Sequence, residues 1–236
     1  MSGLVTVGTL TLDPVASGAE LRAMSGFSTS NYAFSPYNAD LDFGTGDFYV
    51  CGWVKVAATA AQSQILNRTG STGSAWQVKV DITTSKLYFA ITDDFYSTRD
   101  EVTSTSVIDT GSWVCFSAIR SGSNLLVYIN GKHEATKAIT NAAGSLSEAT
   151  AKLFIGITAI LNLPFEGSLT LPRIGSGAPS AEQIKEIYET EKHMFTANSK
   201  ITLSGASDSV LALDYDESTG LLTALTDVQD RFQGLV

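Results

Sequence analysis

The sequence predicts an all-β protein: an antiparallel sandwich of two sheets with one flanking helix and a C-terminal β-hairpin. Three observations support this class. Over residues 1–175, short apolar runs rich in Val, Ile, Thr, Phe and Tyr alternate with Gly, Ser, Asn and Asp, which is the pattern of strands and turns. A helical pattern is nearly absent from that region. The apolar runs also recur at regular intervals, so we expect one continuous sandwich domain.

The clearest strands are short runs of apolar residues with turn residues on either side. They cover residues 48–56, 64–68, 76–81, 86–92, 113–120, 125–129, 152–157 and 165–174. Residues 48–56 are apolar on both faces of the strand, because side chains alternate along a strand. One face carries Phe48, Val50, Val54 and Val56, and the other carries Tyr49, Cys51 and Trp53. Such a strand lies centrally and is covered on both sides.

One tight hairpin follows from the dipeptide Asn130-Gly131. Both residues tolerate the positive φ angles of a type I′ turn, so residues 132–138 form the return strand. A helix is expected over 180–195, because Ser180 and Gln183 form a capping box and Pro179 precedes it. Its apolar residues fall on one stripe, so the helix packs on the outside of the sandwich. That stripe consists of Ile184, Ile187, Tyr188 and Phe195.

The ends of the chain are also strand-like. Residues 4–12 and 232–236 are apolar, and residues 210–215 and 221–226 flank a turn at 216–220. An isolated hairpin is marginal in water, so we expect it to contact other copies of the chain, around a three-fold axis. The predicted organisation is an N-terminal arm over 1–30, a sandwich with its helix over 31–195, and a C-terminal extension over 196–236.

Composition excludes two classes of partner. Only 17% of the 236 residues are charged and the net charge is −9, with no cluster of Lys or Arg to neutralise phosphates, so nucleic-acid binding is not expected. The longest apolar stretch, 153–165, is interrupted by Gly156, Thr158, Asn162 and Pro164, so we expect no membrane insertion. The first residues lack a basic segment followed by an apolar core, so we expect no signal peptide.

Three blocks of sequence resemble laminin G-like modules, pentraxins and other concanavalin A-like jelly rolls. They are ADLDFGTGDFYVCGWVKV, TGSWVCFSAIRSGSNLLVYINGK and PFEGSLTLPRIGSGAPSAEQIKEIY, in that order. The resemblance covers about residues 32–195. It implies a concanavalin A-like antiparallel jelly roll in which Trp113 starts a central strand. Gly167 then permits a close approach where the chain returns to the sheet.

The flanking segments resemble tail-fibre or virion structural proteins of tailed bacteriophages. The segments are SGFSTSNYAFSPYNADLDFGTGDF and EKHMFTANSKITLSGASDSVLALDYDESTGLL. This resemblance implies a domain assembled in the host cytoplasm and located on the virion. Its partners would be copies of itself and other virion proteins.

The resemblance to pentraxins also concerns Cys51 and Cys115, which stand where those proteins carry a disulfide. The two cysteines can bridge if their strands are antiparallel neighbours in register. The alternative is two buried thiols used as small apolar residues, as expected in a reducing cytoplasm.

Calcium is a further implication, because laminin G modules and pentraxins often bind it through carboxylates on rim loops. The candidate ligands here are Asp93, Asp94 and Asp100. An acidic position common in laminin G modules is occupied by Leu169, Thr170 and Leu171. We therefore assign no metal and no other cofactor.

No catalytic residues are predicted. The strands lack the paired carboxylates of a retaining glycosidase, and only His133 and His193 are available as a histidine base. The favoured function is noncatalytic binding of bacterial surface polysaccharide by the loop that contains Asp93, Asp94, Tyr96 and Arg99. An aromatic face and nearby polar groups suit a sugar. The alternative is an architectural virion module without a ligand, and a glycoside hydrolase is the third possibility.

Overall fold

A computed structural model describes residues 3–57, 63–71, 75–81, 83–94 and 98–197, together with the backbone of three later strands, 212–216, 221–225 and 229–233. The chain divides into two compact units. The first contains residues 1–13 and 23–188, and the second contains residues 14–22 and 189–236.

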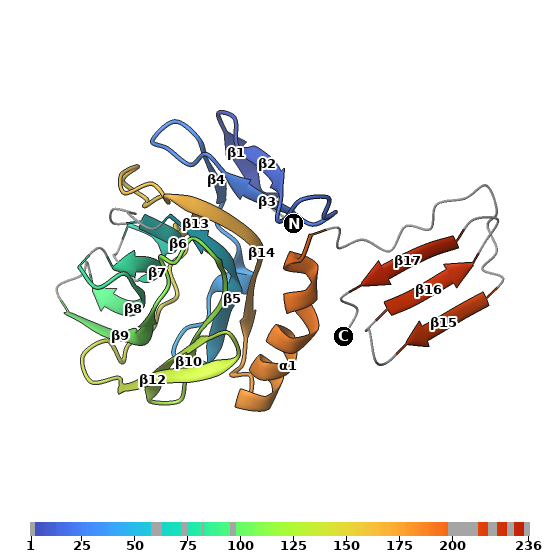
Figure 1. The fold of residues 1–236 in the computed structure, drawn as a ribbon. Helices are drawn as coiled ribbons and strands as arrows, with labels where there is room; N and C mark the ends of the chain where they lie inside the picture. The colour runs from blue at the N-terminus through green and yellow to red at the C-terminus, as the bar shows by residue number, and fades with distance from the viewer. Residues whose placement is uncertain are drawn as a thin grey trace. The chain divides into compact units, whose positions relative to one another are not determined.

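The first unit is a sandwich of two antiparallel sheets (Figure 1). The first sheet has seven strands in the order β1 (Val5–Val7), β4 (Tyr32–Ser35), β13 (Lys152–Ile155), β6 (Ser63–Thr69), β7 (Ala75–Asp81), β8 (Lys86–Asp94) and β9 (Thr98–Val107). The second sheet has seven in the order β12 (Lys132–Ala138), β11 (Asn124–Ile129), β10 (Trp113–Ser121), β5 (Phe48–Val56), β14 (Gly167–Ser176), β3 (Arg22–Ser25) and β2 (Thr11–Pro14). The predicted jelly-roll fold is confirmed.

The core lies between the inner faces of the two sheets. Phe48, Val50, Val54 and Val56 of β5 are fully buried there, as their alternation predicts. Asn130 and Gly131 have φ angles of 51° and 75°, as the tight hairpin requires. Gly167 is also needed, because a Cβ at this position would lie 2.5 Å from the carbonyl oxygen of Lys55.

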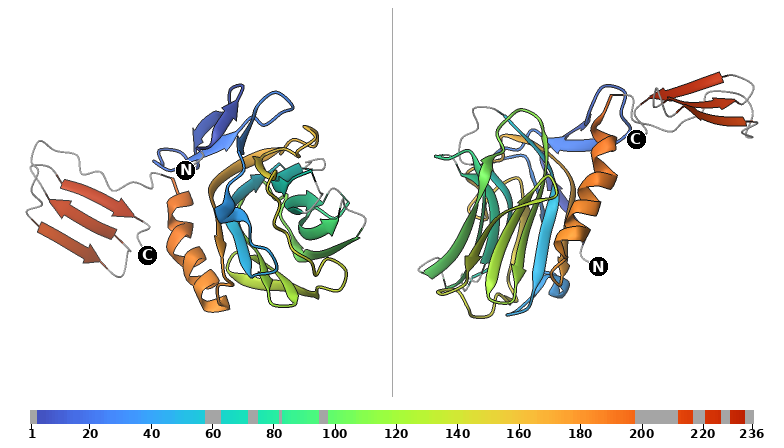
Figure 2. Two further views of the ribbon diagram at one scale, coloured as in Figure 1. Left: turned by 180° about the vertical axis from the view of Figure 1, so that it is seen from behind. Right: turned by 60° about the horizontal axis from the view of Figure 1, so that its bottom comes forward.

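Helix α1 (Ala181–Glu191) packs on the outer face of the second sheet (Figure 2). The ring of Tyr188 stacks on Trp53 of β5 with 5.7 Å between ring centroids, and Ile184 packs against Ile119 and Tyr128. At its start, the amide of Gln183 donates to the Ser180 hydroxyl and the amide of Ser180 donates to the Gln183 side chain. The predicted capping box is therefore confirmed, although the α-helix ends at Glu191 and a short 3₁₀ helix (Lys192–Phe195) follows.

The N-terminal region departs from the sequence prediction. The segment 1–30, predicted to be a strand or arm outside the sandwich, contributes β1, β2 and β3 to the two sheets, and β4 follows directly. Strand β1 pairs with β4, with Val5 opposite Phe34, and Met24 of β3 lies opposite Leu169 of β14. The sandwich therefore begins well before residue 31. A short 3₁₀ helix, Ala39–Leu41, precedes β5.

The second unit contains a small antiparallel sheet of its own. Strand β15 (Ala212–Asp216) pairs with β16 (Leu221–Leu225), as the sequence predicts for a hairpin. Strand β17 (Gln229–Gln233) pairs with β16 as well. The C-terminal extension is therefore a three-stranded sheet rather than a hairpin.

The register of strands β5 and β10 bears on the two alternatives for Cys51 and Cys115, a disulfide or two buried thiols. Strands β5 and β10 are antiparallel neighbours, but Cys51 lies opposite Ser117 and Cys115 lies opposite Trp53. The two cysteines are thus diagonal rather than directly opposed, at a Cα separation of roughly 7–8 Å for such pairs. Both remain thiols and are almost fully buried, which agrees with the alternative of two small apolar side chains.

The edges of the two sheets are joined by Glu134 of β12. Its carboxylate accepts hydrogen bonds from the amides of Thr105 and Ser106 in β9, at 3.0 and 2.8 Å. Burial alone would raise the pKa of Glu134, but these donors and the hydroxyls of the same two residues hold it below its ordinary value. The amides at the edge of β9 are thus hydrogen-bonded to β12 rather than left available to a strand of another chain. In the part of the chain that the structure describes, no helix has the length and apolar character needed to cross a membrane.

Gly156 gives a test of this packing. A Cβ there would lie 2.0 Å from the ring of Phe27, whereas a Cβ at Gly122 would meet nothing within 4 Å, and both residues have positive φ. Gly122→Ala should cost roughly 1–2 kcal/mol from backbone strain alone. Gly156→Ala should cost roughly 1–3 kcal/mol more because the site is overpacked. Urea unfolding measures both, and equal losses would contradict the packing described for Phe27.

Candidate functional site

The loop that the sequence favours as a glycan site connects β8 to β9. Its residues do not form one surface. Asp93 accepts a hydrogen bond from the amide of Gly144 at 2.7 Å, whereas Arg99 is half exposed and forms an ion pair with Glu101. Only the backbone of Asp94 is described, opposite Thr98, and Tyr96 lies outside the described residues. The two described side chains of the predicted glycan site therefore differ in role. Asp93 holds the 140–144 segment, and Arg99 is available for contact.

Asp100 also holds that segment. Its side chain is 2% exposed, and its carboxylate accepts hydrogen bonds from the amides of Thr140, Asn141 and Ala142 at 3.0, 2.7 and 2.7 Å. Burial alone would raise the pKa of Asp100, but the amide donors outweigh burial and hold the pKa below its ordinary value. A cation would have to displace N–H groups that already point at this carboxylate. No cluster of three or more potential metal-ligating side chains occurs among the residues that the structure describes.

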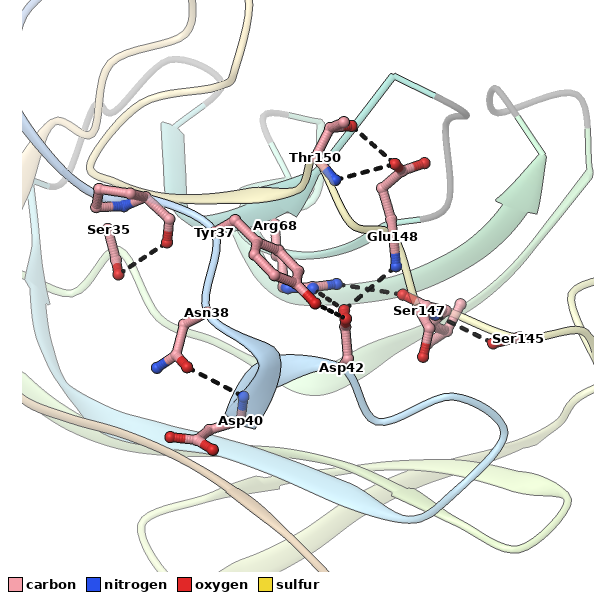
Figure 3. A network of polar contacts seen from close by, with 12 residues as sticks. Ser35, Tyr37, Asn38, Asp40, Asp42, Arg68, Ser145, Ser147, Glu148 and Thr150 are labelled. Atoms are coloured by element: carbon pink, nitrogen blue, oxygen red, sulfur yellow. Dashed lines mark hydrogen bonds and ion pairs between the residues drawn. The ribbon is translucent and has the colours of Figure 1, made fainter. Parts of the chain in front are cut away.

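A second polar network lies beside the 144–150 segment (Figure 3). Arg68, which is 1% exposed, forms an ion pair with Asp42 and donates to the carbonyl of Leu146 at 3.2 Å. The hydroxyl of Tyr37 and the amide of Glu148 also donate to Asp42, at 2.8 and 3.2 Å. A buried ion pair with this many partners fixes geometry more than it adds net stability. We interpret this network as holding the loops in position over the end of the sandwich.

The outer face of the first sheet is different, because its side chains point away from the core. The register of the sheet places one residue from each strand in a single row across all seven strands. In strand order the row is Val5, Phe34, Phe154, Asn67, Gln77, Ala90 and Glu101. We call this set of residues the outer row. Two of its members, Asn67 and Ala90, are each 2% exposed, and Asn67 accepts a hydrogen bond from the amide of Ala159 at 3.2 Å.

One part of the outer row is aromatic. Phe34 and Phe154 stack with 6.1 Å between ring centroids, and Tyr32 lies 6.4 and 6.5 Å from them. All three rings are half-buried, so each keeps an edge or face toward solvent. Lys152 lies beside them, with its Nζ atom 5.7 Å from the Phe34 centroid. Half-exposed rings of this kind provide a stacking surface.

The middle of the outer row borders a shallow depression, which we call the trough. It has no enclosed space that a water molecule could occupy, and its outward side chains are Ala75, Gln77, Ala90, Thr92 and Arg99. Ala75, Ala90 and Thr92 form a buried floor, while Gln77 is half-buried and Arg99 is exposed. Pockets that enclose a small molecule measure roughly 300 Å³ or more. A ligand would therefore lie across the trough rather than inside it.

The far side of the trough is polar. The Nε of Arg99 lies 2.8 Å from Glu101, and the Tyr88 hydroxyl donates to the same carboxylate. Burial and the neighbouring Glu101 both raise the pKa of Tyr88, so it stays a neutral donor. Lys79 sits 4.5 Å from the centroid of the Tyr88 ring, and burial lowers the pKa of this lysine. Glu101 is thus committed to two donors.

The sequence reading selects Arg99 but misses Phe34, Phe154 and Gln77. The outward direction of the two phenylalanines follows from the alternation of side chains along a strand. Ala33 points into the core, so Phe34 points outward. Leu153 and Ile155 point into the core, so Phe154 between them points outward. What the sequence does not give is that these rings, 120 positions apart, lie opposite each other. Together the outer row offers rings for stacking and amide, guanidinium and ammonium groups for hydrogen bonding.

Comparisons with known proteins identify the family and the solved structures that this fold resembles. The family model described as the concanavalin A-like lectin/glucanases superfamily matches residues 27–185. No curated protein sequence matches the chain. Among solved structures, domain 4 of the extracellular arabinanase AbnA from Geobacillus stearothermophilus, in complex with arabinotriose, is 16% identical with a TM-score of 0.62. The match covers 79% of this chain and 87% of that one.

Two toxin domains are similar over more of this chain. The binding domain of Paraclostridial Mosquitocidal Protein 1 is 11% identical with a TM-score of 0.64, and the match covers 94% of this chain. The ligand-binding domain of botulinum neurotoxin serotype D, in complex with N-acetylneuraminic acid, is 14% identical with a TM-score of 0.62 and 99% coverage. This chain spans only 58% and 57% of those two domains. At these identities the likeness shows the fold.

The anchoring role of Asp100 predicts acid sensitivity. A carboxylate whose pKa is lowered by folding stabilises the protein above its unfolded pKa of about 3.9, and that stabilisation is lost as the pH falls toward the folded value. Asp100→Asn should cost about 2–3 kcal/mol at pH 7, because an amide group would face N–H donors.

Urea unfolding between pH 2 and pH 7 tests this prediction. The variant should lose less stability than the wild type as the pH falls below about 4. The matched control is Asp109→Asn, at a carboxylate for which no such set of amide donors is found among the described residues. Parallel curves for the wild type and Asp100→Asn would contradict the anchoring role.

Proposed function

Because the chain belongs to the concanavalin A-like lectin/glucanases superfamily, we propose that it is a noncatalytic carbohydrate-binding domain whose ligand lies on the outer row of the first sheet. The observation that carries this proposal is the combination on one face of half-exposed rings at Phe34 and Phe154 with the hydrogen-bonding groups of Gln77 and Arg99. Sugars are recognised by such a combination of apolar and polar contacts.

The shape of the trough favours a polysaccharide chain over a small molecule. A shallow face that crosses several strands can contact successive sugar units, whereas a deep pocket encloses one. Two of the similar structures carry saccharides, arabinotriose in one case and N-acetylneuraminic acid in the other. This agrees with a saccharide ligand without identifying it.

A binding role also fits the chemistry of the outer row better than hydrolysis does. A glycosidase needs two carboxyl groups about 5 to 9.5 Å apart, depending on its stereochemistry. The side chains lining the trough include no carboxylate. Glu101 borders it but is already bonded to Arg99 and Tyr88.

We place this domain on a bacteriophage virion, in a tail fibre, with bacterial surface polysaccharide as its ligand. The support is the resemblance of the segments flanking the sandwich to phage structural proteins. Of the four residues named for this contact, Arg99 at the start of β9 lines the trough, and we keep Asp94 and Tyr96 as further contacts of the same proposal. Asp93 is excluded from the proposed contact because it holds Gly144.

The architectural alternative is favoured by one observation. The second unit contains a separate three-stranded sheet, β15 to β17, and sheets this small gain stability by packing against another surface. We propose that copies of this sheet contact one another in a homotrimer. Binding and assembly are compatible, since several copies on one particle would raise the avidity for a polymer.

Substitution of Phe154 tests the binding surface. We expect the wild type to bind at least one polysaccharide in an array of bacterial surface glycans. Phe154→Ala should weaken that binding about tenfold, because stacking contributes on the order of 1 kcal/mol per ring pair. Phe154→Tyr keeps a ring and should retain most of the affinity. Thr136→Ala, on β12 of the second sheet, is the control and should bind as the wild type does.

Two outcomes of that experiment would contradict the proposal. An array without hits argues against carbohydrate binding. Hits that survive Phe154→Ala unchanged, with Phe154→Tyr and Thr136→Ala also unchanged, argue against the outer row as the site. Thermal unfolding of each variant separates lost contact from lost folding.

Assembly is tested by light scattering of the full chain at micromolar concentration. The homotrimer predicts a mass of about three times the 25.0 kDa of one chain. A strict monomer under these conditions would contradict the proposed contact through β15 to β17.

A further inference from the structure

We propose that the saccharide bound by the outer row carries carboxylate groups, as uronic-acid or sialic-acid polymers do, and that Arg99 is the residue that recognises them. This inference rests on the proposed function. It adds the chemical class of the ligand, which neither the family nor the fold specifies.

The first observation is the hydrogen-bonding state of Arg99. Its side chain is 51% exposed, and its Nε is paired with Glu101. Among the residues that the structure describes, its two Nη groups contact no acceptor. The pairing at Nε orients the guanidinium while leaving its terminal fork available beside the trough. An arginine fork matches the two oxygens of a carboxylate in a bidentate contact.

The second observation is the absence of opposing charge where the ligand would lie. The side chains lining the trough are apolar or neutral apart from Arg99 itself. The nearest carboxylate, Glu101, is already compensated by Arg99 and by the Tyr88 hydroxyl. The protein carries a net charge of −9, but exposed charges more than about 8 Å away are largely screened at physiological ionic strength.

The third observation is a second cation on the same face. Lys152 lies opposite Thr69, Thr69 lies opposite Ala75, and Ala75 lies opposite Thr92, which is next to Arg99 at the edge of the sheet. Lys152 is exposed, and within the described part of the chain it has no carboxylate partner. Its Nζ atom lies 5.7 Å from the centroid of the Phe34 ring.

The spacing of these two cations sets the length of ligand that can use both. Four strand intervals separate β13 from β9, which is roughly 19 Å at about 4.8 Å per interval. The residues between them are uncharged: Thr69 is half-buried, and Ala75 and Thr92 are buried. A single sugar can reach only Arg99, whereas an oligosaccharide with repeated carboxylates can reach Arg99 and Lys152 together.

The experiment compares acidic bacterial polysaccharides with their carboxyl-reduced forms, in which each carboxylate has become a primary alcohol on the same backbone. Binding of the full chain is measured by calorimetry. We expect reduction to weaken binding at least tenfold, as is usual when a hydrogen bond to a charged group is removed. R99Q should cause a similar loss toward the acidic form and a clearly smaller loss toward the reduced form, because a neutral hydrogen bond contributes less than one to a charged group.

Four further variants separate recognition from general charge effects. K137Q removes the same charge from β12 of the second sheet and should bind as the wild type does. R99K keeps the charge without the fork and should remain several-fold weaker than the wild type. R99Q/E101Q removes the carboxylate that R99Q leaves uncompensated and should still fail to recover binding. K152Q should weaken binding of long acidic fragments and leave disaccharide binding unchanged.

The outcomes distinguish this inference from the proposed function. If neither acidic nor neutral glycans bind, the proposed function fails and the inference fails with it. If glycans bind but the carboxyl-reduced forms bind as well as the acidic ones, the ligand is neutral and only the inference fails. It also fails if R99Q binds acidic glycans like the wild type, or if R99Q/E101Q regains full affinity.

Discussion

The structure depends on burial of one face of each seven-stranded sheet against the other. Because side chains alternate along a strand, fixing the inner set also fixes the outer set, and a shift by one residue would exchange the two. Phe48, Val50, Val54 and Val56 are held inside, as are Ala33, Leu153 and Ile155. The same packing therefore sets Phe34 and Phe154 outward and places them opposite each other. The proposed glycan surface is a consequence of how the core packs.

The ends of the sandwich obey a different constraint. The segments at 36–47 and 139–151 cross the end of the core. Their backbone amides and carbonyls form hydrogen bonds with buried charged side chains. Asp100 receives three amides, and Arg68 joins Asp42 to Leu146. A buried charge with these partners is costly to remove because its partners would be left unsatisfied. Acidic residues that suggest a calcium or sugar site by their position in a loop instead serve to hold other loops.

Sequence alone was sufficient for the parts of the fold that local pattern determines. The central strands, the Asn130-Gly131 turn and the capping box at Ser180 each follow from neighbouring residues, and each is confirmed. Strand β9 was missed because Ser, Thr and charged residues dominate it and its edge position buries little. Sequence left open whether Cys51 and Cys115 form a disulfide, because that depends on the register between two strands that lie far apart in the chain. Of the candidate site, the sequence predicts only Arg99. The roles of Asp93 and Asp100 in holding other loops could not be predicted, because their hydrogen-bond partners lie 40 to 51 positions away in the chain.

The central claim is that carbohydrate contacts the outer face of the first sheet. Its most direct test is amide chemical-shift mapping of the isotope-labelled full chain during titration with a fragment of a bound polysaccharide. The account predicts that perturbations concentrate on β4, β13, β6, β7, β8 and β9, with the amide shifts of β10 to β12 unchanged. Perturbations confined to the helix-covered face of the second sheet, or to β15 to β17, would contradict it.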